Sequence, residues 1–201
     1  MVALTLEFGV AGCVAPGHWV SGDLEVVHYY NDGGAALIAV IDGVGHGEEA
    51  ANTARLAADT LLANPRAPPA TLLSRCHAVL RGTRGAVLSI ASIDLQRAML
   101  SWLGVGNVSG VVSRGARNVL TAPEELMARP GVLGSGELPA LKAATLPLRI
   151  RDTLILATDG IRRHFADEIT VGTSAQELAD DIIARHCARN DDALVVVARA
   201  S

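Results

Sequence analysis

Short runs of apolar residues, separated by polar residues or glycine, divide the chain into its expected elements. The continuous run AALIAVI at residues 35–41 predicts a buried strand, and TLILA at 153–157 and ALVVVA at 193–198 also predict strands. Further strands are expected at residues 5–14, 23–30, 86–94, 98–105, 108–114 and 141–148. Short polar or glycine-containing turns separate the strands between residues 86 and 114, as antiparallel hairpins require.

Three segments have the spacing of helices. Residues 48–62 carry an apolar face at helical intervals, formed by Ala50, Ala54, Ala57 and Leu61. A second helix is expected over residues 70–81. A third is expected to begin at Ser174, because Ser174 and Glu177 have the spacing of a capping box. The stretch from Pro123 to Pro139 is rich in Gly and Pro and is expected to be irregular.

The order of these elements indicates the fold class. Strands come first, then two helices, several strands, one helix and a last strand. This order favours antiparallel sheets with helices on the outside over a doubly wound parallel sheet. With 201 residues, half of them hydrophobic, the chain is expected to form a single domain over residues 1–201.

Composition excludes several functions and says little about others. The net charge is −4 and the basic residues are scattered, so no basic stripe is expected to track nucleic acid. No signal peptide or membrane-spanning run is visible, so we expect no membrane association. Three isolated cysteines, Cys13, Cys76 and Cys187, indicate neither a disulfide framework nor a thiolate zinc site. This cysteine usage is typical of a protein in the reducing cytoplasm.

Four acidic segments lie at the borders of apolar strands. They are Ser21-Gly22-Asp23, Asp42-Gly43-Val44-Gly45-His46-Gly47, Thr158-Asp159-Gly160 and Asn190-Asp191-Asp192. Any one Asp-Gly pair is usually only a turn. Asp42 and Asp159, however, each end a buried strand, where a carboxylate is costly without a partner of opposite charge. If the last strand runs antiparallel to the one before Asp159, Asp191 meets Asp159 at one edge of a sheet.

Such a cluster of carboxylates predicts a cation site. Like charges repel, and bound cations are the usual remedy. The donors are oxygen atoms without a thiolate pair, so the hard ions Mg²⁺ or Mn²⁺ suit them better than structural zinc. Two such ions together are able to activate water and neutralise phosphate charge. The segment DGVGHG lacks the Lys-Ser/Thr ending of a phosphate-binding P-loop.

The ordered set SGD, DGVGHG, TDG and NDDALVVV resembles the metal-dependent type 2C (PPM) protein phosphatases, most closely their bacterial SpoIIE/RsbX branch. The segment GVGNV at residues 104–108 is also similar to the RsbX subgroup, and the resemblance spans residues 12–198. It implies an α+β fold: a four-layer αββα sandwich, in which two antiparallel sheets pack face to face between helices. It also implies a serine/threonine phosphatase that uses two Mg²⁺ or Mn²⁺ ions.

The resemblance assigns roles to individual residues. Asp42 would bridge both ions, and the Gly43 carbonyl would complete one ion site. Asp159 and Asp191 would hold the other ion, and Asp23 would lie beside the first, directly or through water. Bridging water would then attack phosphorus in line, without a phosphoenzyme. Two further residues complete the expected site: Asp192, as a support for the ligands or a ligand itself, and Gly45.

The chain departs from its eukaryotic relatives at two positions. Those relatives place a histidine directly after the bridging Asp-Gly, thought to protonate the leaving alkoxide, where this chain has Val44. His46, two residues further on, is the tentative candidate for that role. Those relatives also bind phosphate through an arginine near the N-terminus, and no clear equivalent precedes Asp23. His18 is either a polar substitute or a histidine of a surface loop.

RsbX-type enzymes are feedback phosphatases of the stressosome that remove phosphate from Ser or Thr of STAS-domain scaffold proteins. The resemblance therefore implies phosphorylated STAS-domain partners similar to RsbS and RsbR. Two alternatives stay open: a catalytically weak phosphoprotein-binding module of the same fold, and a phosphomonoesterase for small molecules. The retained aspartates argue against the first, and the scarcity of aromatic residues that would bind a base argues against a nucleotide substrate. Neither Ser21 nor Cys76 lies in a known nucleophile motif.

Overall fold

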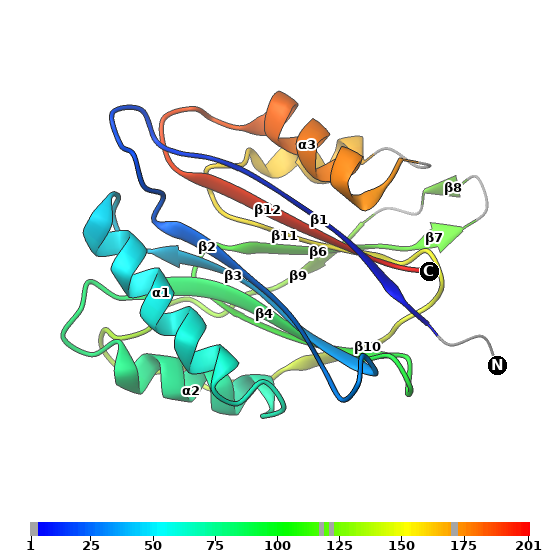
Figure 1. The fold of residues 1–201 in the computed structure, drawn as a ribbon, viewed down its shortest axis with the longest axis horizontal. Helices are drawn as coiled ribbons and strands as arrows, with labels where there is room; N and C mark the ends of the chain where they lie inside the picture. Colours follow the sequence, from blue (N-terminus) through cyan, green and yellow to red (C-terminus); the bar gives the residue numbers. More distant parts are fainter. Residues whose placement is uncertain (1–3, 117–118, 121–122, 170–172) are drawn as a thin grey trace.

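A computed structural model describes residues 4–116, 119–120, 123–169 and 173–201. Its main feature is a pair of five-stranded antiparallel sheets (Figure 1). The first sheet has the order β1-β12-β11-β6-β9 and the second β10-β5-β4-β3-β2. The strands of the first sheet are β1 (Leu6–Cys13), β12 (Ala193–Ala200), β11 (Thr153–Ala157), β6 (Ser109–Ser113) and β9 (Glu124–Leu126). Those of the second are β10 (Ala144–Pro147), β5 (Met99–Val105), β4 (Ala86–Asp94), β3 (Ala35–Gly43) and β2 (Asp23–Tyr30). A small separate ribbon joins β7 (Gly115–Ala116) to β8 (Val119–Leu120).

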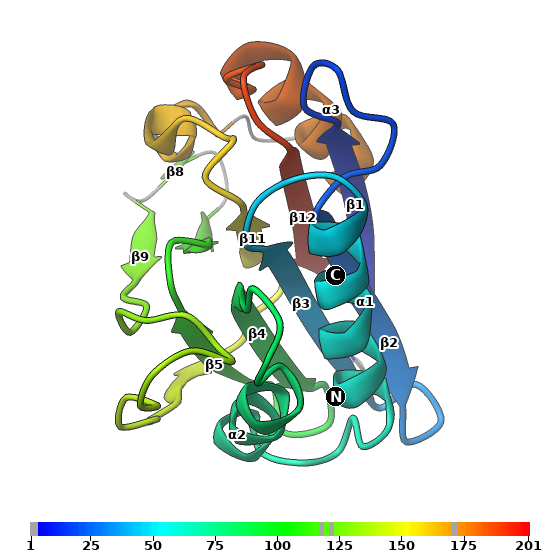
Figure 2. The ribbon, with the colours of Figure 1, turned by 90° about the vertical axis from the view of Figure 1, so that its left-hand side faces the viewer.

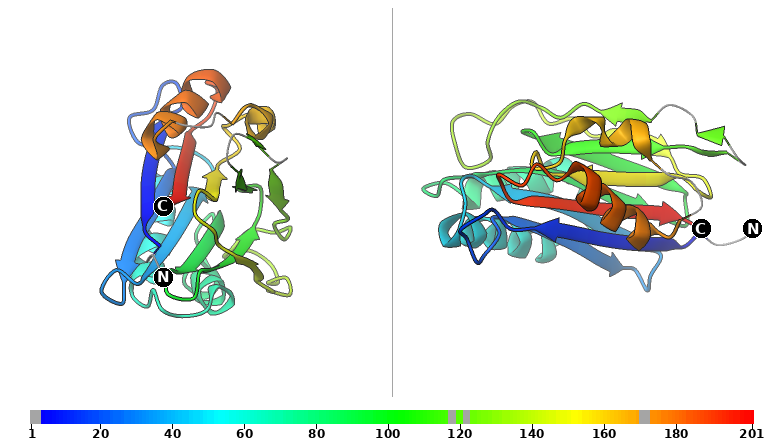
Figure 3. Two further views of the ribbon diagram at one scale, coloured as in Figure 1. Left: turned by 90° about the vertical axis from the view of Figure 1, so that its right-hand side faces the viewer. Right: turned by 90° about the horizontal axis from the view of Figure 1, so that it is seen from above.

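Helices cover the outer face of each sheet. Helices α1 (Glu48–Leu62) and α2 (Pro69–Val79) pack on the second sheet. Helix α3 (Ala175–His186) and the 3₁₀ helix η1 (Arg163–Glu168) pack on the first (Figures 1 and 3). A separate apolar cluster fills the space between the sheets. These layers confirm the predicted α+β sandwich.

Strand β3 illustrates why this sequence folds into layers. Its apolar residues are fully buried, because the strand is covered on both faces. Leu37, Ala39 and Ile41 face the helices, while Ile38 and Val40 face the other sheet. A strand between two apolar layers gains nothing from a polar face, which explains the continuous apolar run.

The sequence located most elements closely. The helix at 48–62 and the capping box of Ser174 and Glu177 are confirmed. The helix predicted at residues 70–81 lies at Pro69–Val79, because proline is well suited to a first helical position. The expectation that Pro123 to Pro139 is wholly irregular was wrong, since β9 lies within it. Three residues are too few to show a strand period, so β9 left no recognisable pattern.

The four acidic segments lie at one end of the sandwich, which faces the viewer in Figure 2. Asp23 begins β2 and pairs in register with Asp42 near the end of β3. Strands β11 and β12 are antiparallel neighbours, so the end of one lies beside the beginning of the other. No helix among the described residues is long and apolar enough to cross a membrane.

Candidate metal centre

Three of the predicted aspartates line one cavity of about 490 Å³. Asp42 comes from the end of β3, Asp159 from the turn after β11, and Asp191 from the turn before β12. His46 and Gly45 line the same cavity from the β3–α1 loop. Asp23 lies beside it, opposite Asp42 in the β2–β3 register. The structure thus brings residues from both sheets and four separate segments to one place.

Glycine next to the aspartates permits close backbone packing. A Cβ on Gly43 would collide with the Ala50 carbonyl of α1, and a Cβ on Gly160 would collide with the Asp192 carbonyl. The two Asp-Gly pairs therefore hold the helix and the neighbouring loop close behind the carboxylates. Substitution at either glycine would push these segments away from the cavity.

The carboxylates carry unbalanced negative charge. Burial, followed by repulsion from the neighbouring aspartates, raises the pKa of Asp42 to about 8. Burial also raises the pKa of Asp23 to about 7, although a hydrogen bond from Thr158 opposes the rise. The pKa of Asp159 is raised by burial and then by Asp191. Raised pKa values of this kind mean that each ionised carboxylate lacks an adequate positive partner.

Two polar side chains orient the carboxylates. Thr158 Oγ1 donates to Asp23 Oδ2 at 2.7 Å and accepts from the Leu194 amide at 2.9 Å. Asn107, in the turn between β5 and β6, donates through Nδ2 to Asp159 Oδ2 at 2.5 Å. Sequence reasoning assigned neither residue a role. The only signals were their positions, Thr158 directly before Asp159 and Asn107 within the GVGNV segment.

Asp192 faces the backbone of the β1–β2 loop. Its two carboxylate oxygens accept hydrogen bonds from the Ala15 and Gly22 amides, each at 2.7 Å. The residue is only 3% exposed and does not line the cavity. This geometry favours a supporting role for Asp192 over direct contact with an ion.

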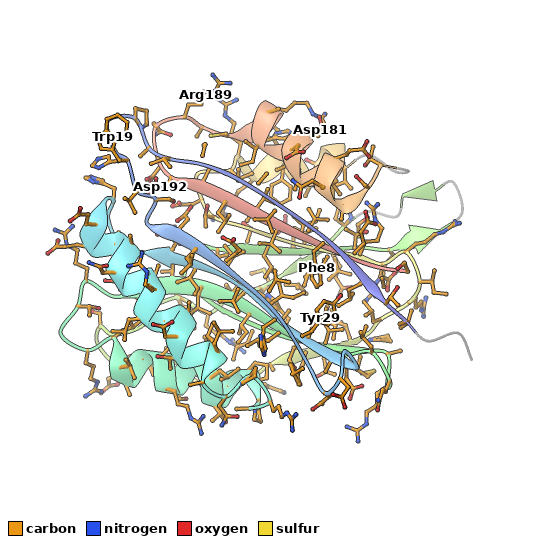
Figure 4. The ribbon with its side chains drawn as sticks, viewed as in Figure 1. Phe8, Trp19, Tyr29, Asp181, Arg189 and Asp192 are labelled. Atoms are coloured by element: carbon orange, nitrogen blue, oxygen red, sulfur yellow. The ribbon has the colours of Figure 1, made fainter. Side chains whose placement is uncertain are left out.

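The β1–β2 loop forms part of the rim of the cavity. The rings of His18 and His46 are 4.3 Å apart and tilted by 42°. Trp19, beside His18, is 97% exposed and lies at the same end of the molecule as Asp192 (Figure 4). His18 is thus a half-buried member of a histidine pair at the rim, and Trp19 projects into solvent next to it.

The donor set fits hard divalent cations. Within the described part of the chain, no group of three or more His, Cys, Asp or Glu side chains is placed to hold a metal ion by itself. The carboxylates instead surround an open cavity. Mg²⁺ is commonly held in this way, by one or two carboxylates while water completes its shell. The oxygen-only donors and their raised pKa values both agree with such an ion.

Comparison with known proteins agrees with the fold and identifies the family. The family described as Stage II sporulation protein E (SpoIIE) matches residues 32–201. "Phosphoserine phosphatase RsbX" of Bacillus subtilis (strain 168) is 26% identical over 171 residues, which cover 82% of this chain and 81% of that protein.

Solved structures extend the likeness to the whole fold. One, described as "The bacterial stressosome: a modular system that has been adapted to control secondary messenger signaling", has a TM-score of 0.87 and 29% identity. The match covers 97% of this chain and 100% of the chain in that structure. A crystal structure of RsbX in complex with magnesium has a TM-score of 0.84 and 20% identity, over 98% of this chain and 96% of that one.

The chain belongs to the SpoIIE family of type 2C serine/threonine protein phosphatases. It is therefore an enzyme of the phosphoprotein phosphatase class, in a family whose members are typically metal-dependent.

Proposed function

We propose that this protein hydrolyses phosphoserine or phosphothreonine esters with two Mg²⁺ or Mn²⁺ ions held at the acidic cavity. Asp42 would contact both ions and the Gly43 carbonyl would complete one ion site. Asp159 and Asp191 would hold the other ion, with Asp23 beside the first. The observation that carries the proposal is the meeting of Asp42, Asp159 and Asp191 at one cavity of about 490 Å³.

Bound ions of this kind supply an activated water and neutralise the charge of the phosphoryl group. The chain's own residues prepare the place for this chemistry. Asn107 fixes the orientation of Asp159, and Thr158 fixes that of Asp23. Asp192 holds the β1–β2 loop against the start of β12, which keeps Asp23 and Asp191 in one site.

His46 is the proposed proton donor to the leaving alkoxide. It is exposed, lines the cavity with Asp42 and lies against His18. Histidine is the side chain that most often serves as a general acid in enzymes. Cys76 does not offer an alternative nucleophile, because it is fully buried between α1 and α2.

We propose that the substrates are phosphorylated STAS-domain proteins of a bacterial stressosome, similar to RsbS and RsbR, and that the enzyme acts on them as a feedback regulator in the cytoplasm. Support comes from the likeness to RsbX and to the stressosome structure. The three cysteines are few and isolated in the sequence, a usage typical of proteins in a reducing compartment. The exposed Trp19 at the cavity rim also favours a macromolecular substrate, since tryptophan is enriched in protein interfaces.

The test is release of phosphate from a phosphorylated STAS-domain protein in the presence of Mn²⁺, Mg²⁺ or chelator. Asp42→Asn is the site variant, and Asp59→Asn, an exposed aspartate on α1, is its matched control. The native chain and the control are expected to release phosphate only with metal. Asp42→Asn is expected to be at least about 100-fold slower, because loss of an ion removes several kcal/mol of transition-state stabilisation.

The other outcomes separate the chemistry from the partner. Metal-dependent release from an aryl phosphate but not from the STAS-domain protein would keep the reaction and reject the proposed substrate. Metal binding without release from either compound would reject catalysis and favour a phosphoprotein-binding module.

A further inference from the structure

Cys13 and Cys187 lie far apart in the sequence but meet in the fold. Cys13 is the last residue of β1, and Cys187 directly follows α3. Both side chains pack against the apolar cluster that lies between α3 and the first sheet. Both residues are partly exposed and line one surface cavity of about 350 Å³, together with Ile183 and Arg189. The two side chains therefore share one surface cavity that small molecules in solvent are able to reach.

The two cysteines lie on backbone segments that contact the loops of the acidic site. Cys13 pairs with Ala193, the residue directly after Asp192, and the amide of Ala15 two residues further on donates to the Asp192 carboxylate. On the other side, Cys187 forms a β-bridge to Ile161. The next residue, Ala188, donates its amide to the Gly160 carbonyl at 2.8 Å. Figure 4 shows Arg189 and Asp192 on this connection between α3 and β12.

We propose that Cys13 and Cys187 form a redox-active dithiol, which a peroxide converts into a reversible intramolecular disulfide. Both side chains line the same cavity and pack on the same apolar cluster, so the two sulfurs are neighbours in the fold although 174 residues separate them in the chain. Both lie where a regular element ends, and Cys13 leads into a loop, so the backbone is less constrained than within a sheet or helix. The inference does not depend on the phosphatase activity.

The chemistry balances with one peroxide. Burial, and then contact with Cys187, raises the pKa of Cys13 to about 12, so Cys13 stays protonated at neutral pH. The same two steps lead to the disulfide whichever thiol reacts first; Cys187 is taken as the first. Its sulfur attacks one peroxide oxygen, the O–O bond breaks and one water leaves, which gives a sulfenic acid on Cys187. The Cys13 sulfur then displaces the sulfenic oxygen, which leaves as a second water with the Cys13 proton, and the S–S bond forms.

A bond here would have a clear structural consequence. It would connect the end of β1, and hence the β1–β2 loop, to the connection that carries Asp191 and Asp192. A covalent link between segments so far apart in sequence restricts the unfolded chain strongly. We therefore expect the oxidised protein to unfold at a higher temperature than the reduced protein.

The chain supplies its own control in Cys76, which is fully buried between α1 and α2. Hydrogen peroxide would be added to the metal-free native chain and to the variants Cys13→Ser, Cys187→Ser and Cys76→Ser. Each protein would then be analysed by peptide mapping, intact mass and thermal unfolding. In the native chain and in Cys76→Ser we expect a Cys13–Cys187 cross-linked peptide, a mass loss of two hydrogens and a Tm increase of several degrees. Dithiothreitol should reverse all three, and neither Cys13→Ser nor Cys187→Ser should show them.

Two results would overturn the proposal. One is a native chain in which peroxide leaves both thiols free or carries Cys187 on to the sulfinic acid without a cross-link. The other is oxidation of Cys76 to the same extent as the pair, which would show general unfolding. Because the cross-linked peptide is sought in the native chain, the test holds even if a serine variant folds poorly.

Discussion

The carboxylate of Asp42, near the end of β3, has a pKa of about 8 in the folded protein, against an ordinary value of 3.8. The cause is burial, followed by repulsion from neighbouring carboxylates. Without a cation, Asp42 therefore destabilises the folded protein whenever it is ionised. The same residue that would hold the ions is thus a stability cost in their absence.

This cost has a definite pH dependence. Between pH 3.8 and about 8, the unfolded chain has an ionised Asp42 while the folded chain keeps the proton. Stability therefore falls as pH rises through this range. With chelator present, Asp42→Asn should have a higher Tm than the native chain at pH 8.5, by about 3 °C or more, and a smaller advantage at pH 5.5. Thermal unfolding measures the difference in Tm between Asp42→Asn and the native chain. An equal difference at both pH values would contradict a raised pKa of Asp42.

Asn107, in the turn between β5 and β6, donates a hydrogen bond to Asp159 in the turn after β11. Groups that orient metal ligands typically change metal affinity by 10–100-fold when removed. We expect Asn107→Ala to weaken Mn²⁺ binding by about 10-fold or more, while the fold is retained because Asn107 is exposed. Calorimetric titration measures the affinity, with Asn52→Ala on the exposed side of α1 as the control. Unchanged affinity in Asn107→Ala would remove Asn107 from the site.

At the scale of elements, Asp192 connects the β1–β2 loop to the start of β12. Each of its oxygens accepts one backbone amide, so an asparagine at this position would leave one buried amide facing another donor. An unpaired buried donor costs about 1–3 kcal/mol. We expect Asp192→Asn to lower the free energy of unfolding by about this amount in urea titrations, whereas Asp167→Asn at an exposed position should be neutral. A neutral Asp192→Asn would show that the loop is held by other contacts.

The same elements show how far the sequence alone leads. Continuous apolar runs and the Ser174–Glu177 spacing located the main strands and the helix ends, because each depends on neighbours in the chain. The sequence placed Asp159 near Asp191 only on the condition that their strands are antiparallel neighbours, and β11 and β12 meet that condition. The bonds from Asn107 to Asp159 and from Thr158 to Asp23 join distant segments, and no local pattern encodes them. Likewise, three isolated cysteines gave no sign that Cys13 and Cys187 line one cavity.

At the scale of the whole molecule, the site joins the two sheets at one end of the sandwich. An ion bound there stabilises the folded state, because the unfolded chain scatters its ligands. Asp23 and Asp42, whose pKa values are about 7 and 8, are largely protonated at pH 5.5, so an ion must displace their protons. The Tm increase caused by a fixed concentration of Mg²⁺ or Mn²⁺ should therefore be larger at pH 8 than at pH 5.5. An increase that is larger at pH 5.5 would contradict carboxylate ligation.

The central claim is that the aspartates of both sheets hold two divalent ions, with Asp42 in contact with both. Crystals grown with Mn²⁺ and measured for anomalous scattering test this claim most directly. The account predicts two anomalous peaks about 3.5–4 Å apart in the cavity. Asp42 should lie between them and Asp159 and Asp191 should lie against one of them. A cavity without manganese, or with one ion that does not contact Asp42, would contradict the account.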